Sequence, residues 1–125
     1  MPGCWTLTVQ NWHPTRLNAV RGRHWAVEHR AKRTDAAIYR FAAIVAGCPK
    51  ATGRRRVRLE MGGWRTGKVP DKDAWAKVCL DALVRAGLLT DDGERGLEGQ
   101  LEVVYHRGAK KWTRLILEDC PEEGA

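Results

Sequence analysis

The stretch that decides the fold is Arg54-Arg55-Arg56-Val57-Arg58-Leu59-Glu60-Met61. Val57, Leu59 and Met61 alternate with charged side chains, and this period of two residues is typical of a β-strand with one buried face. Two glycines follow at once, so the strand is expected to end in a flexible, basic loop over 62–68. A chain of 125 residues usually forms one domain, and we expect this strand to lie within its sheet.

Helical patterns flank this strand on both sides. No helix breaker occurs from Trp25 to Ala46, and Gly47 with Pro49 ends this first helix. Its apolar stripe is expected to consist of Ala31, Ala36, Ala37, Ile38, Phe41, Ala42, Ile44 and Val45. A second helix is expected from Asp73 to Ala86, with an inward face formed by Trp75, Val78, Cys79, Ala82, Leu83 and Ala86.

Three further strands complete the expected order β-α-β-α-β-β. Loose alternation over 4–9 indicates the first, and the segments 97–105 and 112–118 indicate the last two, which a turn containing Gly108 would join into an antiparallel hairpin. This order predicts a single α+β domain over 1–125, with a small mixed sheet and helices packed on one face. A short, flexible, acidic tail is expected at 119–125.

Charge is distributed unevenly along the chain. Residues 1–70 carry 14 basic and 3 acidic side chains, whereas residues 71–125 carry 8 basic and 12 acidic ones, giving +11 and −4 and the total of +7. An excess of Lys and Arg attracts phosphates and releases their counterions, so the first half predicts a surface that binds a polyanion. The alternative is a solvated basic face followed by an acidic tail.

Several classes of protein are excluded by what the sequence lacks. It contains no serine, which excludes serine-nucleophile hydrolases, and its four widely spaced cysteines predict reduced thiols rather than a zinc or thioredoxin-type motif. No apolar run reaches the ~18–20 residues of a transmembrane helix, so we expect a cytoplasmic protein that does not bind membranes. Gly62 to Lys68 fits the start of a phosphate-binding loop, but Val69 replaces the magnesium-binding hydroxyl, and we expect no nucleotide cofactor.

The strongest chemical pattern is a group of acids around the second helix. Asp71 and Asp73 would point to the same side of an extended segment, and such carboxylates are typical ligands of Mg²⁺ or Mn²⁺. Lys77 follows one helical turn later and Asp81 another turn on, where a lysine could stabilise a phosphoryl group. Each acid also has a purely structural interpretation, with Asp73 as a helix cap and residues 91–93 as a turn.

Asp92 could join this group in one of two ways. The helix carries the chain away by ~20 Å, and the six residues after it can return at most ~20–22 Å. We therefore expect either that 88–90 runs back along the helix, or that a partner subunit supplies Asp92.

The run Asp71-Lys72-Asp73-Ala74-Trp75-Ala76-Lys77-Val78-Cys79-Leu80-Asp81-Ala82-Leu83, followed by Gly87 and Asp91-Asp92, resembles the D-x-D-N-x-x-K-x-x-x-D-A-L…D-D signature of RusA-type Holliday-junction resolvases. The spacing matches without a gap over 71–92, and the segment 13–18 with His24-Trp25 is more loosely similar to the family's opening. One position departs from the signature: Ala74 replaces an Asn whose amide could orient a neighbouring carboxylate.

The resemblance implies an α+β homodimer, encoded by a bacterium or a phage, that acts in DNA recombination and repair. Such a protein binds four-way DNA junctions and nicks opposing strands with Mg²⁺. By position, Asp71, Asp73 and Asp92 would be the metal-binding carboxylates, and Lys77 the catalytic lysine.

The expected DNA contacts are basic side chains that hold the phosphate backbone without reading bases. They are Arg21, Arg23, Arg30, Lys32, Arg33, Arg65 and Lys68, to which the amino-terminal similarity adds Arg16, Asn18 and His24. Trp64 is a candidate for stacking on a base. Two alternatives stay open: a noncatalytic nucleic-acid-binding module, and another divalent-metal phosphoesterase that acts on small nucleotides.

Overall fold

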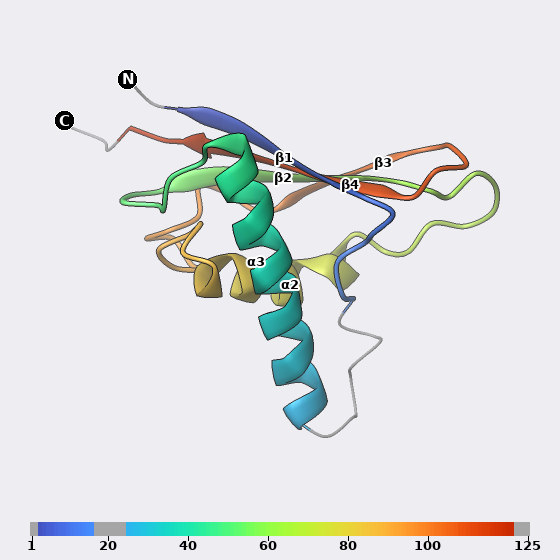
Figure 1. Ribbon diagram of the computed structural model, residues 1–125, viewed down its shortest axis with the longest axis horizontal. Coiled ribbons are helices and arrows are strands. Elements are labelled where there is room, and N and C mark those ends of the chain that lie inside the picture. Colours follow the sequence, from blue (N-terminus) through green and yellow to red (C-terminus); the bar gives the residue numbers. More distant parts are fainter. Residues whose placement is uncertain (1–2, 17–24, 122–125) are drawn as a thin grey trace.

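The computed structural model describes residues 3–16 and 25–121. Within these ranges the expected order β-α-β-α-β-β is confirmed, and the chain forms one α+β unit (Figure 1). The elements are β1 (Cys4–Gln10), α2 (Trp25–Ala46), β2 (Arg55–Gly62), α3 (Asp73–Arg85), β3 (Glu102–His106) and β4 (Trp112–Asp119). None of the helices in the described part of the chain is long and apolar enough to cross a membrane.

The four strands form one mixed sheet in the order β1-β4-β2-β3. β4 runs antiparallel to both of its neighbours, whereas β2 and β3 run parallel. The predicted hairpin of the last two strands is therefore wrong, because β2 lies between β3 and β4. The connection crosses the end of β2, where Gly63 has φ +125° and a β-carbon would meet the Lys111 backbone at 3.1 Å.

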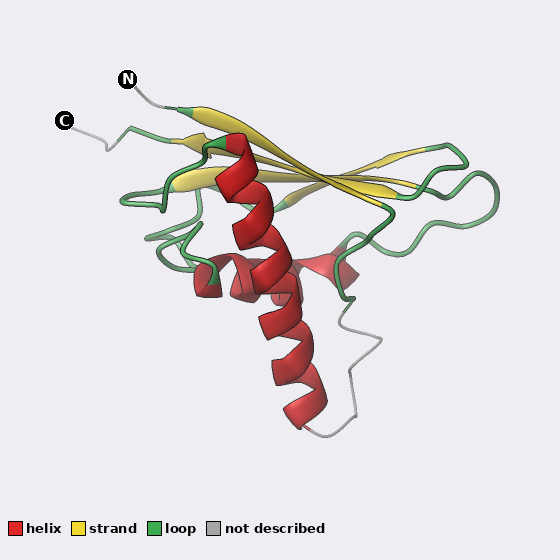
Figure 2. Cartoon of the chain, viewed as in Figure 1, coloured by secondary structure: helices red, strands yellow, loops and turns green. Residues whose placement is uncertain are grey.

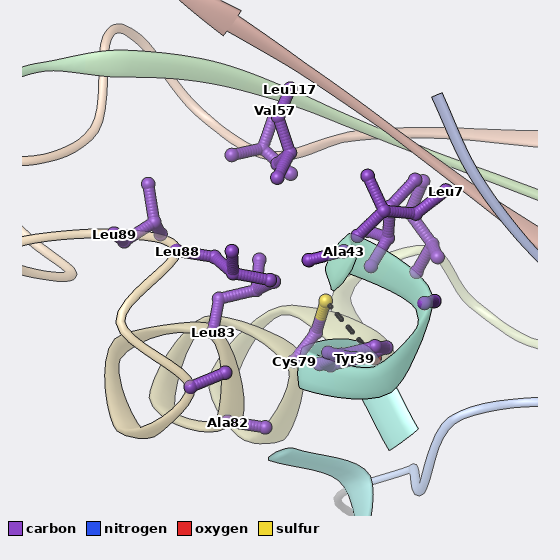
Figure 3. Packing of buried hydrophobic residues seen from close by; sticks show 14 of the residues in the cluster. Leu7, Tyr39, Ala43, Val57, Cys79, Ala82, Leu83, Leu88, Leu89 and Leu117 are labelled. Carbon is purple, nitrogen blue, oxygen red and sulfur yellow. Dashed lines mark hydrogen bonds between the residues drawn. The ribbon is translucent and has the colours of Figure 1, made fainter. Parts of the chain in front are cut away.

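One face of the sheet forms the core with both helices (Figure 2). The register aligns a buried row across all four strands, in which Leu7 opposes Leu115, Leu115 opposes Leu59, and Leu59 opposes Val103. Figure 3 shows side chains of α2, α3 and the loop after α3 meeting this face, with the Tyr39 hydroxyl donating to Cys79 Sγ at 3.6 Å. The alternation that predicted β2 is thus an inward and an outward face of the sheet.

The inward face of α2 differs from the predicted stripe. Ala36, Tyr39, Ala42 and Ala43 are buried, whereas three side chains assigned to the stripe are exposed by 70–74%: Phe41, Ile44 and Val45. Apolar residues surround the carboxy-terminal half of α2, so periodicity alone did not separate its two sides. Apart from Tyr39, the buried hydrophobic residues described on α2 are alanines, which let the helix pack against α3 and β1.

Asp119 does not belong to the flexible tail that was expected at 119–125. Asp119 belongs to β4, and its carboxylate accepts a hydrogen bond from Arg55 Nε at 2.7 Å. Arg55 is only 1% exposed and also donates to the carbonyls of Pro49 and Leu88, at 3.0 and 3.2 Å. The expectation for Asp119 is wrong because a buried guanidinium holds it, and residues 122–125 lie outside the described residues.

Candidate functional site

The two acids of the predicted metal pair lie where α3 begins. Asp73 is the first residue of the helix, and Lys72, which precedes it, makes no side-chain capping hydrogen bond. The backbone of Asp71 accepts the hydrogen bond from the Ala74 amide at 3.1 Å. Both carboxylates are exposed, and neither is hydrogen-bonded or ion-paired to a described residue. Asp73 therefore does not act as a cap, and both charges remain available.

A half-buried pair of hydrogen bonds fixes this start of the helix. The Tyr105 hydroxyl donates to the carbonyl of Pro70 at 2.7 Å, and it accepts a hydrogen bond from Trp75 Nε1 at 2.6 Å. Burial raises the pKa of Tyr105, so the hydroxyl keeps the proton that it donates. Because Pro70 directly precedes Asp71, β3 holds the acidic segment through one side chain.

Aromatic rings pack behind the same segment. Trp64 stacks on His13 with ring centroids 4.3 Å apart and contacts Trp75 and Tyr105 edge-on, at 6.1 and 5.1 Å. His13 Nε2 lies 2.6 Å from the carbonyl of Gly62, and burial lowers the pKa of His13, which favours the neutral ring. Trp64 therefore supports the fold, and the interpretation as a base-stacking residue finds no support in its packing.

Lys77 lies between the amino-terminal acids and a second polar cluster. It is one turn beyond Asp73 and one turn before Asp81, so all three side chains share one face of α3. Its side chain is 59% exposed, and its ammonium group lies 3.8 Å from Glu28 Oε1 of α2. This loose contact leaves Lys77 accessible to an anion from solvent.

The second cluster joins α2 to α3 around Lys32. Lys32 Nζ lies 2.7 Å from Asp81 Oδ2 and 3.2 Å from Glu28 Oε1. Burial acts to lower the pKa of Lys32, but the hydrogen bonds with Asp81 and Glu28 raise it overall. Asp92 lies beside Asp81, and a hydrogen bond between the two side chains raises the pKa of Asp92. Lys32 thus joins the two helices by pairing with one carboxylate from each, while Asp92 adds a third acid beside Asp81.

The predicted return of the chain along α3 takes place only in part. Leu88 and Leu89 are buried in the core and turn the chain back, as the reach of the segment allowed. Asp92 lies beside Asp81. Asp81 is eight residues after Asp73 on α3, which is ~12 Å of helix rise. Among residues 3–16 and 25–121, no group of three or more His, Cys, Asp or Glu side chains could hold a metal ion. One chain thus presents Asp71 and Asp73 as a pair, with Asp92 elsewhere.

The predicted DNA contacts fall into three groups. Exposed side chains on α2 and in the loop after β2 are Arg30, Arg33, Arg65 and Lys68. Arg16 lies over the Trp75 ring at 5.9 Å, whereas Lys32 is paired with Glu28 and Asp81. Asn18, Arg21, Arg23 and His24 lie outside the described residues.

Two residues of this region were missed by the sequence analysis. Tyr105 reaches Pro70 because β3 lies parallel to β2, a pairing that no local pattern indicated. Arg107 donates to the carbonyls of Trp64 and Gly67, at 3.2 and 2.7 Å, and so ties the glycine-rich loop to the connection after β3. A basic residue after a strand is too common to single out.

Comparison with known proteins adds no family to these observations. A scan against protein-family models finds no match, and a search of curated proteins finds no significant similarity.

Proposed function

We propose that this chain is a divalent-metal-dependent endodeoxyribonuclease that acts on branched DNA, with four-way junctions as its substrate class. One observation carries the proposal: Asp71 and Asp73 are exposed and lack described partners, although the segment that bears them is held by Tyr105. A fixed pair of uncompensated carboxylates is a suitable ligand set for a hard cation. The resemblance over 71–92 supports the same function.

The acidic pair fits Mg²⁺ better than the predicted three-carboxylate set does. Mg²⁺ usually keeps several waters and binds one or two carboxylates together with substrate phosphates. Residues two apart have Cα atoms within ~7 Å, so Asp71 and Asp73 can share one ion. When bound, the ion would activate water and neutralise charge on the scissile phosphate. Asp92 is not needed for this donor set, and its place beside Asp81 separates it from the pair.

The basic side chains supply the rest of the proposed site. Lys77, one turn beyond Asp73 and largely exposed, would contact the phosphate that undergoes cleavage. Arg30, Arg33 and the exposed loop residues would hold neighbouring phosphates without reading bases. We assign Lys32 to the support of Asp81 rather than to DNA, because its charge is already paired.

A noncatalytic DNA-binding module is the second candidate. The observation that favours it is the position of Asp92, which leaves only two of the three carboxylates implied by the resemblance in one place. Ala74 agrees with it, because this residue is buried and offers no amide to the acids. Such a module would bind junctions with or without a divalent ion.

Cleavage of a synthetic four-way junction distinguishes the two candidates. The nuclease is expected to make paired nicks in Mg²⁺, and Asp73→Asn should lower the cleavage rate at least 100-fold, an order-of-magnitude value for a lost metal ligand, while junction binding is kept. Glu94→Gln, at an exposed acid outside the proposed site, is the matched control and should cleave normally. Binding without nicking by the wild-type chain would favour the module, and equal cleavage by Asp73→Asn would reject the assigned site.

The two routes for Asp92 can be separated in the same assay. We expect Asp92→Asn to slow cleavage less than Asp73→Asn does. If a partner subunit supplied Asp92, each variant would be inactive alone, and a mixture of the two would regain cleavage because one composite site would be intact. If cleavage does not recover and Asp92→Asn alone has a mild effect, the result supports a metal site formed by Asp71 and Asp73 without Asp92.

A further inference from the structure

An uncharged apolar surface lies between α2 and the free edge of β1. Phe41, Ile44 and Val45 are the large hydrophobic side chains exposed in the described part of the chain. A groove beside them is lined by Thr8, Val9, Gln10, Ala37, Phe41 and Val45. Contiguous apolar surface of this kind marks interaction sites, and no described helix or strand covers it.

β1 is an edge strand without the usual protection against pairing. It is seven residues long, Cys-Trp-Thr-Leu-Thr-Val-Gln, with neither a charged side chain nor a proline. The opposite edge strand, β3, is shorter and carries Glu102, paired with Arg58 at 3.1 Å, and His106, which contacts Glu60 at 2.9 Å. Charges of this kind prevent edge-to-edge association, whereas an uncharged edge offers its backbone to another strand. The two edges therefore differ in the way expected if a partner covers β1.

The lining of the groove favours a second copy of the same chain as that partner. A two-fold interface brings identical surfaces together, so a charged lining would place like charges face to face, where they repel each other. The β1 side of the patch is uncharged, while Arg33, Arg40 and Arg85 line the surface on the other side of Phe41. A stable interface needs ~800 Å² per partner, more than three side chains supply, so we combine the patch with the strand edge.

We propose that two copies of the chain pair through antiparallel β1 strands, which makes the sheet continuous across the dimer and buries Phe41 and Val45 against the partner. This surface is assigned independently of the nuclease activity. The resemblance implies a homodimer without indicating which surface forms it. An acidic, apolar protein segment docked among the three arginines would be a different occupant.

Sedimentation velocity of the full chain over a range of concentrations tests the proposal. We expect the wild-type chain to form a dimer. The double variant Phe41→Lys with Val45→Lys should raise the dissociation constant of this dimer at least tenfold. Ala109→Lys, at an exposed site in the connection between β3 and β4, should leave it unchanged. Because Phe41 and Val45 are exposed in the single chain, the double variant should keep the far-ultraviolet circular dichroism of the wild type. A monomer at all concentrations, or a dimer that survives the double substitution, would overturn the proposal.

Amide hydrogen exchange gives a second readout that needs no variant. Dilution below the dissociation constant should speed exchange in β1, where the partner strand is lost, and leave β3 unchanged. A dimer whose dissociation speeds exchange in β3, or in neither edge strand, would contradict pairing through β1.

Discussion

The hydroxyl of Tyr105 should stabilise both the fold and the acidic segment. Tyr105→Phe removes the group that accepts from Trp75 Nε1 and donates to the carbonyl of Pro70. Trp75 is 2% exposed, so its N–H would be left without a partner. An unsatisfied buried donor costs ~1–3 kcal/mol, and the lost bond to Pro70 about 1 kcal/mol more, so the free energy of unfolding should fall by roughly 2–4 kcal/mol.

Urea denaturation measures this change directly. With a typical slope of ~2 kcal/mol/M, the midpoint should fall by about 1–2 M. Tyr39→Phe is the control, because it removes the hydroxyl of a tyrosine that is more deeply buried than Tyr105 and whose described partner is only the Cys79 thiol at 3.6 Å. It should cost less than ~1 kcal/mol. A Tyr105→Phe midpoint no lower than that of Tyr39→Phe would refute the reasoning. Where Tyr105→Phe remains folded, junction cleavage should also slow, because Pro70 is released.

Three further predictions concern buried ionisable groups. Arg55→Ala should lower the unfolding free energy, measured in urea, by ~3–5 kcal/mol, because it removes a buried guanidinium with three oxygen partners. Arg56→Ala, at an exposed ion pair, should cost less than ~1 kcal/mol, and equal effects of the two substitutions would contradict this assignment. Burial raises the pKa of Cys79 to about 12, so mass spectrometry should find this thiol alkylated by iodoacetamide near pH ~8 only after denaturation. Burial also raises the pKa of Asp35, despite hydrogen bonds from Thr15, so its favourable contribution is complete below the unfolded value of 3.8 and is lost as the pH rises through the folded pKa. The unfolding free energy of the wild type minus that of Asp35→Asn should therefore decrease as the pH rises through this window, and a constant or increasing difference would contradict it.

The elements of this fold could be read from local patterns. Val57, Leu59 and Met61 repeat at the strand period, and Gly47 with Pro49 ends the first long helix, so the order of helices and strands followed from neighbours in sequence. The pairing of strands could not be read in this way. A glycine-containing connection between two strands predicts a hairpin, yet β2 inserts between β3 and β4 through contacts far apart in the chain.

The residues of the candidate site could likewise be predicted from the sequence, but their arrangement in space could not. Its acids and Lys77 were identified from spacing, but their surroundings depend on tertiary packing. The segment after α3 is long enough for Asp92 to come back to Asp73. Leu88 and Leu89 are buried in the core, however, and Asp92 lies beside Asp81 instead. The hydrogen bond from the Tyr105 hydroxyl to the carbonyl of Pro70 likewise depends on the parallel register of β2 and β3.

The most direct test of the proposed site is to locate the bound metal. Titrating Mn²⁺ into isotopically labelled protein and following amide signals by nuclear magnetic resonance reports which residues lie near the ion. The signals of residues 71–74 should broaden first, and the double substitution of Asp71→Asn with Asp73→Asn should abolish this broadening. Broadening centred on Asp81 and Asp92, or broadening that persists in the double variant, would contradict a metal site at the start of α3.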